Sequence, residues 1–249
     1  MKYLPKRILQ ATMLASGLLL LNACGGGGGS TAPDTNTTTP EATSITHNGT
    51  TYGFVTSPHT GKVWLDKNLG AAEICAGFDD SQCYGDYYQW GRDYDGHQDK
   101  DSGTSTQQSS NVTDVRHANF IKANGIYSHD WAKATDASGS RRMLNWSKID
   151  GSSVCPAGFR VPSIDEFKAE TLDKGVSNRA TAFTNFLKLP SSGSRAGFDG
   201  SMYSVGSTAL VWSSTAVSSN SFGVFFRSSS GGVHSGSRAD GFSVRCLKN

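Results

Sequence analysis

The chain has 249 residues, with 23 Lys and Arg against 21 Asp and Glu and a formal net charge of +2. Three of the bases, Lys2, Lys6 and Arg7, lie at the N-terminus, and subtracting them leaves 20 bases against 21 acids in the rest of the chain. Such a near-neutral sequence lacks the basic surface on which binding of nucleic acid depends, so we expect no nucleic-acid partner.

The N-terminal residues have the pattern of a bacterial lipoprotein signal. An apolar stretch over residues 8–21 follows the three bases and is shorter than a membrane-spanning helix needs, and the small residue Ala23 directly precedes Cys24. This pattern predicts a signal peptide over 1–23 and acylation of Cys24, which would tie the protein to a membrane by its lipid. Because Gly25 follows the cysteine, we expect an outer-membrane lipoprotein. We favour a domain exposed at the cell surface, and a domain facing the periplasm is the alternative.

Composition divides the rest of the chain into a linker and a domain. Residues 24–45 are rich in Gly, Ser, Thr and Pro without apolar periodicity, which predicts a lipidated cysteine followed by a flexible linker. Residues 46–249 are numerous enough to bury a hydrophobic core and are predicted to form one domain.

Four cysteines lie in this domain: Cys75, Cys83, Cys155 and Cys246. In an oxidising compartment an even number indicates two disulfides, with three possible connectivities. The spacing favours Cys75 with Cys83 and Cys155 with Cys246. Because the sequence has no Cys-x-x-Cys and no His pair at ligand spacing, we expect no metal site and no cofactor.

The first part of the domain is predicted to form sheet. Asn48-Gly49 lies between β-prone residues of the stretch 45–55, which is the strongest short signal for a hairpin. Residues 57–61 predict a turn, and residues 62–65 alternate like a half-buried strand.

The middle of the domain is predicted to change from loop to helix. Residues 99–113 are polar and predict an exposed loop, and residues 159–162 predict a short strand ended by proline. Ser163 and Glu166 have the spacing of a capping box, which predicts a helix that stops near Gly175.

The last third is predicted to be strands and loops. Residues 182–189 indicate a second helix or its end, whereas residues 191–246 alternate Ser, Gly and β-formers and predict no helix. Together these elements predict an α+β, loop-rich fold with two central helices and a strand and loop C-terminal third. The five tryptophans are expected in the core: Trp64, Trp90, Trp131, Trp146 and Trp212.

Several stretches read together resemble the Fibrobacter succinogenes major paralogous domain of secreted and lipid-anchored bacterial proteins. They are TGKVWLDKNLGA (60–71), QCYGDYYQWGR (82–92), DGH (95–97), CPAGFRVP (155–162) and SVRC (243–246). The resemblance implies a C-type-lectin-like fold related to formylglycine-generating enzymes, with the terminal strands side by side and long loops for recognition. It implies no activity, because the family has no settled one.

The end of the chain also resembles the variable region of diversity-generating retroelement target proteins. The stretches are VWSSTA (211–216), FGVFFR (222–227), GVH (232–234) and RADGFSVRC (238–246). In those systems a reverse transcriptase rewrites a lectin-like surface at template adenines while its framework is kept. The resemblance implies that residues 211–246 carry a variable ligand-binding surface; the same framework also occurs in members that are not diversified.

Alternation along residues 222–227 separates a core face from an outward face. Val224 and Phe226 would face the core. Gly223, Phe225 and Arg227 would then point outward, whereas a register slip by one residue would invert the two faces. We expect these outward residues and others in the Ser/Gly-rich loops to contact the ligand. The full set is Val217, Ser219, Gly223, Phe225, Arg227, His234 and Ser237.

Other chemistry has weaker signals. Asp93, Asp95, Asp99 and Asp101 could offer oxygen ligands to calcium, but their spacing does not match an EF-hand and a solvated acidic turn is the favoured interpretation. Formylglycine-generating enzymes use two cysteines near the C-terminus, where this chain has Cys246 alone.

The expected function is therefore that of a binding protein without enzymatic activity, whose partner is an extracellular protein or glycan. Two alternatives stay open. One is an invariant adhesive or structural envelope lipoprotein, and the other is a divergent enzyme of the formylglycine-generating type.

Overall fold

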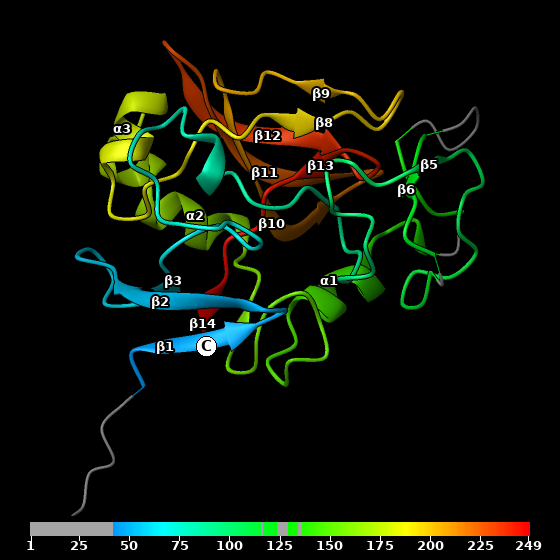
Figure 1. The fold of residues 1–249 in the computed structure, drawn as a ribbon, viewed down its shortest axis with the longest axis horizontal. Helices are drawn as coiled ribbons and strands as arrows, with labels where there is room; N and C mark the ends of the chain where they lie inside the picture. The colour runs from blue at the N-terminus through cyan, green and yellow to red at the C-terminus, as the bar shows by residue number, and fades with distance from the viewer. Residues whose placement is uncertain (1–41, 116, 124–128, 134–135) are drawn as a thin grey trace, which may run out of the picture. The chain divides into compact units, whose positions relative to one another are not determined.

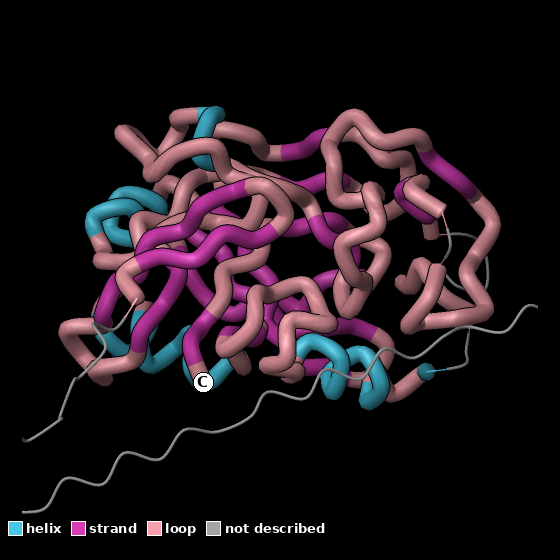
Figure 2. Tube along the Cα trace, turned by 60° about the horizontal axis from the view of Figure 1, so that its bottom comes forward, coloured by secondary structure: helices cyan, strands magenta, loops and turns pink. Residues whose placement is uncertain are grey.

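The computed structural model describes residues 42–115, 117–123, 129–133 and 136–249, so the expected signal peptide, Cys24 and most of the linker lie outside the described residues. Many short strands and a few short helices are joined by long loops (Figure 1), and Figure 2 shows how much of the chain is loop. The α+β, loop-rich fold class is thus confirmed. Within these ranges no helix has the length and apolar character to cross a membrane.

A five-stranded sheet contains both ends of the domain. Its order is β1 (Ser44–His47), β2 (Thr50–Thr56), β3 (Val63–Leu65), β14 (Leu247–Lys248) and β7 (Phe159–Arg160). Asn48 and Gly49 form the expected two-residue turn, with φ of 48° and 78°. The sheet begins at Ser44, two residues before the expected boundary. Trp64 and Leu65 are both buried rather than alternating, because the two faces of β3 contact different core clusters.

The C-terminal third builds a second sheet from three antiparallel strands. These are β10 (Ala209–Val217), β11 (Asn220–Phe226) and β12 (Gly231–Ser237), in that order. A four-stranded sheet has the order β4 (Tyr88–Gln89), β13 (Gly241–Phe242), β8 (Ser194–Arg195) and β9 (Met202–Tyr203).

The expected exposed loop over 99–113 is partly wrong. It contains β5 (Thr104–Ser105), which pairs in parallel with β6 (Phe120–Ile121), and it buries Gln108 and Val112. The Gln108 side chain donates to the carbonyl of Lys122 at 2.6 Å. This polar residue therefore forms a buried hydrogen bond within the domain instead of facing solvent.

Three short α-helices and two 3-10 helices complete the described part. They are α1 (Ser140–Trp146), α2 (Ile164–Glu170), α3 (Arg179–Thr184), η1 (Ser81–Cys83) and η3 (Leu172–Lys174). The capping box of α2 is confirmed, since the Ser163 side chain accepts from the Glu166 N–H at 3.3 Å and the Glu166 carboxylate accepts from the Ser163 N–H at 2.9 Å. The helix then tightens into η3 and stops at Gly175, where φ is 81°.

The prediction of two central helices is incomplete. α1 was not expected, because its N-cap is Gly139 and no side chain caps its start. The second expected helix, over 182–189, lies earlier as α3, and the apolar residues Leu187 and Leu189 that suggested it are buried beyond its end. From Ser191 onward the chain forms strands and loops, as expected.

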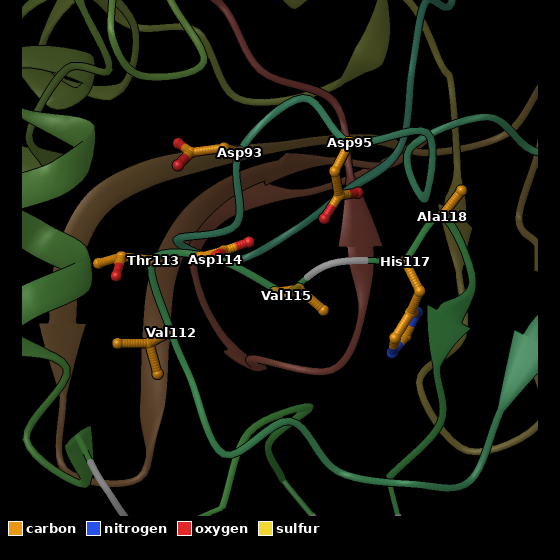
Figure 3. A pocket seen from close by; sticks show the side chains of 8 residues that line it. All are labelled: Asp93, Asp95, Val112, Thr113, Asp114, Val115, His117 and Ala118. Atoms are coloured by element: carbon orange, nitrogen blue, oxygen red, sulfur yellow. The ribbon is translucent and has the colours of Figure 1, made fainter. Parts of the chain in front are cut away.

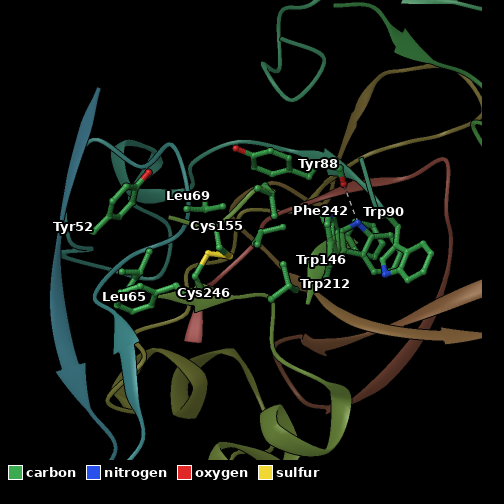
Figure 4. Close-up of a cluster of buried hydrophobic side chains, with 14 residues drawn as sticks. Tyr52, Leu65, Leu69, Tyr88, Trp90, Trp146, Cys155, Trp212, Phe242 and Cys246 are labelled. Atoms are coloured by element: carbon green, nitrogen blue, oxygen red, sulfur yellow. Dashed lines mark hydrogen bonds between the residues drawn. A yellow bond between two sulfur atoms is a disulfide. The ribbon is translucent and has the colours of Figure 1, made fainter. Parts of the chain in front are cut away.

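Two large clusters form the core. One surrounds the disulfide between Cys155 and Cys246 and includes Trp90, Trp146 and Trp212 (Figure 4). The other packs α2 and α3 against one face of β10 and β11. A second disulfide joins Cys75 to Cys83, so both expected pairings are confirmed. All five tryptophans are fully buried.

Candidate functional site

The seven residues expected to contact the ligand lie on or beside the β10–β12 sheet but do not form one patch. Val217 pairs with Asn220, which pairs with Ser237, so Val217, Ser237 and the turn residue Ser219 lie at the β10–β11 hairpin end. Phe225 and Arg227 lie at the opposite end of β11, about 20 Å away at 3.3 Å per residue. The structure therefore brings together two smaller groups.

Three of these residues were expected in loops and are on strands instead. Val217 is the last residue of β10, and His234 and Ser237 belong to β12. The Ser/Gly-rich sequence of β12 has little intrinsic preference for a strand. It forms one because it pairs along its whole length with β11, and because Gly232 and Gly236 lie beneath large rings: a Cβ on Gly236 would be 2.6 Å from Trp212.

The prediction for Gly223 is wrong. It was expected to point outward, but it is buried, and a Cβ there would lie 2.5 Å from the carbonyl oxygen of Val211. The expectation assumed that one face of β11 meets solvent. In the structure one face packs on the α2 cluster through Val224, while Trp212 and Phe242 cover the centre of the other. Gly223 therefore cannot be a variable ligand contact.

At the far end of the sheet the alternation does hold. Val224 and Phe226 are fully buried, Phe225 is half-buried and Arg227 is exposed. The Arg227 guanidinium lies 5.1 Å from the centre of the Phe225 ring, and that ring meets His234 edge-on at 6.3 Å. This arrangement is a cation over an aromatic face next to a second ring.

The row continues inward to the core. His234 lies 5.6 Å from Phe242, whose ring stacks on Trp212 at 4.1 Å. We call the set Arg227, Phe225, His234, Phe242 and Trp212 the aromatic row. Its inner members are buried and anchored, since the Trp212 indole donates to the carbonyl of Tyr88 at 2.9 Å. The outer members are thus held on a rigid base.

The charge of the aromatic row at neutral pH comes from Arg227. Burial lowers the pKa of His234, and the positive charge of Arg227 lowers it further, so this imidazole is neutral at pH 7. The backbone around Arg227 is fixed, because its carbonyl accepts from the Arg179 N–H and its own N–H donates to Ser230, both at 2.7 Å. The row therefore presents one cation and two rings in a defined geometry.

Two other arginines of the C-terminal segment are framework. Arg238 is fully buried and donates to the carbonyls of Ser218 and Ala137, each at 2.8 Å. Arg245 is also buried, where it contacts Asn68 at 3.0 Å, and burial lowers its pKa to about 9. Residues 211–246 therefore contain positions whose substitution would disturb the fold.

The acidic segment around Gly96 lines a cavity of about 410 Å³ together with residues 112–115, 117 and 118 (Figure 3). Its carboxylates already have protein partners. Asp95 accepts from Arg92 at 2.8 Å and from His97 at 2.6 Å, and Asp93 accepts from Asn145 at 2.6 Å. Across the described ranges, no group of three or more His, Cys, Asp or Glu residues is placed to hold a metal ion.

Sequence reasoning missed one exposed aromatic pair. Phe198 lies in the β8–β9 turn and Tyr203 in β9; they are 67% and 44% exposed, and their ring centres are 5.5 Å apart. The sequence feature that could have predicted this pair is an aromatic residue in the run Gly197-Phe198-Asp199-Gly200. Such a run predicts a surface turn, where a large side chain cannot be buried in the core.

Comparisons with protein-family models, with curated proteins and with solved structures gave no match. A function for this chain therefore rests on its sequence pattern and on the geometry described above.

Proposed function

We propose that the chain is a lipid-anchored, outer-membrane binding protein that displays a C-type-lectin-like domain at the cell surface. Its ligand is an extracellular protein or glycan, and its contact surface is the outer end of the aromatic row, at Phe225, Arg227 and His234. The single observation that carries this proposal is that row, since aromatic residues and arginine dominate binding hot spots and the inner rings hold the outer ones in place.

The fold supports the lectin-like part of the proposal. The resemblance to the Fibrobacter succinogenes major paralogous domain implies terminal strands that lie side by side. In the structure the first and last strands share one sheet, with β2 and β3 between β1 and β14. The disulfide between Cys155 and Cys246 ties the same C-terminal strand to the middle of the chain. A framework closed in this way leaves loops and strand ends free to differ between relatives.

The proposal includes no enzymatic activity. An enzyme of the formylglycine-generating type needs a free thiol, whereas Cys246 is bonded to Cys155 and is fully buried. This favours a binding protein over that alternative.

Lipid attachment is tested by Cys24→Ser in cells that express the full chain. Without the acyl chains the protein should move from the membrane fraction to the soluble fraction, because the predicted lipid on Cys24 would be its attachment to the membrane. Protease added to intact cells should digest the wild-type domain if it faces the medium. A Cys24→Ser protein that stays in the membrane fraction would contradict the anchor.

The neighbouring DNA distinguishes a diversified surface from an invariant adhesive one. Diversification predicts a near-copy of the segment encoding 211–246, differing where the copy has adenine, next to a reverse-transcriptase gene. Changes should then fall on Phe225, Arg227 and His234 and spare Gly223 and Arg238. A locus without such a copy supports the invariant adhesive lipoprotein.

A further inference from the structure

A small cavity of about 150 Å³ lies apart from the β10–β12 sheet. It is lined by Tyr52 of β2, Tyr88 of β4, Gly70, Asp86 and the exposed Tyr94, together with Asn48 and Thr50 at the β1–β2 turn. Tyr52 and Tyr88 belong to the disulfide-centred core cluster, and Figure 4 shows their hydroxyl groups pointing toward one another. Tyr52 and Tyr88 are therefore fixed by the core, whereas Asn48, Gly70 and Tyr94 are exposed and open the cavity to solvent.

Asp86 is a poorly compensated carboxylate in this cavity. Its side-chain hydrogen bond comes from the Tyr88 hydroxyl at 3.2 Å, and no ion pair joins it to a described residue. The nearby Lys67 is engaged elsewhere: its ammonium donates to the carbonyl of Thr51 at 2.7 Å and lies over the Tyr52 ring. A charge held in this way favours either a proton or an incoming cation.

The pKa of Asp86 fits that description. The pKa of Asp86 is raised to about 6, chiefly by burial; the Tyr88 hydrogen bond lowers it and the negative charge of Asp99 raises it. The carboxylate is thus mostly ionised at neutral pH and protonated in mild acid. Tyr52 and Tyr88 have raised pKa values and keep their protons across this range.

The backbone leaves room for the carboxylate. Gly70 has φ of 76°, and a Cβ there would lie 2.3 Å from the carboxyl carbon of Asp86. The Gly70 N–H donates to the Tyr52 hydroxyl at 2.9 Å, which fixes that oxygen at the edge of the cavity. Any larger residue at this turn would displace Asp86 from the cavity.

The cavity matches one class of ligand. A primary ammonium has three N–H donors, and the carboxylate and tyrosine hydroxyl oxygens retain lone pairs to accept them. A cavity of about 150 Å³ has room for an ammonium with a short carbon chain. We propose that this cavity binds the primary ammonium group of a small amine, or of a lysine side chain, through Asp86 and the hydroxyls of Tyr52 and Tyr88.

The test is an NMR titration of the full chain with propylamine, with N-acetyl-lysine amide and with tetramethylammonium, which has no N–H donor. Propylamine should cause saturable shifts at residues around Asp86, and its affinity should fall about tenfold from pH 7 to pH 5 as the carboxylate takes up a proton. Asp86→Asn should abolish these shifts. The matched control Glu73→Gln removes the same charge from an exposed side chain and should change nothing.

Tighter binding of the lysine derivative would assign the ammonium to a protein partner, and tighter binding of propylamine would assign it to a free amine. The proposal is overturned if propylamine causes no saturable shift, if Asp86→Asn keeps the binding, or if tetramethylammonium binds equally well. None of these results bears on the aromatic row, because its residues do not line this cavity.

Discussion

Phe225 and Phe226 are sequence neighbours with different surroundings. Phe226 is fully buried against α2 and α3, whereas Phe225 is half-buried under Arg227. A cavity in a packed core costs both the transfer of the lost atoms and the void that remains. A half-buried ring at a strand end loses only part of that contact.

Phe226→Ala should therefore lower the free energy of unfolding by about 3 to 5 kcal/mol, and Phe225→Ala by about 1 kcal/mol. Urea unfolding of the two variants and the wild type measures both values. Equal losses would mean that both rings are core, and the outer end of the aromatic row would then offer no aromatic contact.

At the same scale, period-2 alternation predicted Val224, Phe226 and Arg227 correctly and failed at Gly223. Alternation reports which side a residue faces but not whether that side is covered. The Val211 carbonyl and the Trp212 ring, which lie against Gly223, come from β10, so no signal within β11 marked Gly223 as buried.

Elements with a strong local signal were predictable, and those fixed from a distance were not. The Asn48-Gly49 turn and the Ser163 capping box lie entirely within short stretches of sequence. α1 lacks such a signal and is held by Arg142, whose guanidinium contacts Asp130 at 2.7 Å and Asp136 at 3.1 Å. The cavity at Asp86 is likewise lined by segments that are far apart in the sequence, so no local sequence motif predicted it.

Glu166 connects three elements through its carboxylate. It accepts from Arg160 of β7 at 2.7 and 2.8 Å, from Lys62 beside β3 at 2.6 Å, and from the Ser163 N–H at the start of α2. Burial alone would raise the pKa of Glu166, but these hydrogen bonds hold it well below its ordinary value of 4.5. A depressed pKa contributes stability above pH 4.5 that is lost as the pH falls.

Glu166→Gln should lower the free energy of unfolding by about 1 kcal/mol at pH 7, since solvent screens a partly exposed pair. The difference from the wild type should shrink below pH 4.5, as the folded wild type loses its advantage. Urea unfolding between pH 7 and pH 3 measures it, with the exposed neighbour variant Asp165→Asn as control. A difference that stays constant across this range would show that the charge of Glu166 does not stabilise the fold.

For the whole molecule, the two disulfides differ in the length of chain that they close. Cys155 and Cys246 are 91 residues apart, and Cys75 and Cys83 are 8 apart. The unfolded chain loses more freedom when the longer loop is closed.

Replacing Cys155 and Cys246 together by Ser should lower the free energy of unfolding by about 4 to 5 kcal/mol, and replacing Cys75 and Cys83 by about 2 to 3 kcal/mol. Denaturant unfolding under non-reducing conditions compares the two double variants. A larger decrease in the free energy of unfolding on removing the Cys75–Cys83 disulfide would show that local packing, and not loop closure, determines how much each disulfide stabilises the fold.

The central claim is that the outer end of the aromatic row contacts the ligand, and binding of the purified chain to glycan and secreted-protein arrays tests it most directly. Phe225→Ala with Arg227→Ala should weaken binding to any target that the wild type recognises by about 30-fold, the loss of roughly 2 kcal/mol expected of a hot spot. The matched control replaces the other exposed aromatic pair, Phe198 and Tyr203, and should leave binding unchanged. Full affinity in the Phe225 and Arg227 variant, with binding lost in the Phe198 and Tyr203 variant, would contradict the account and place the contact surface at the β8–β9 turn.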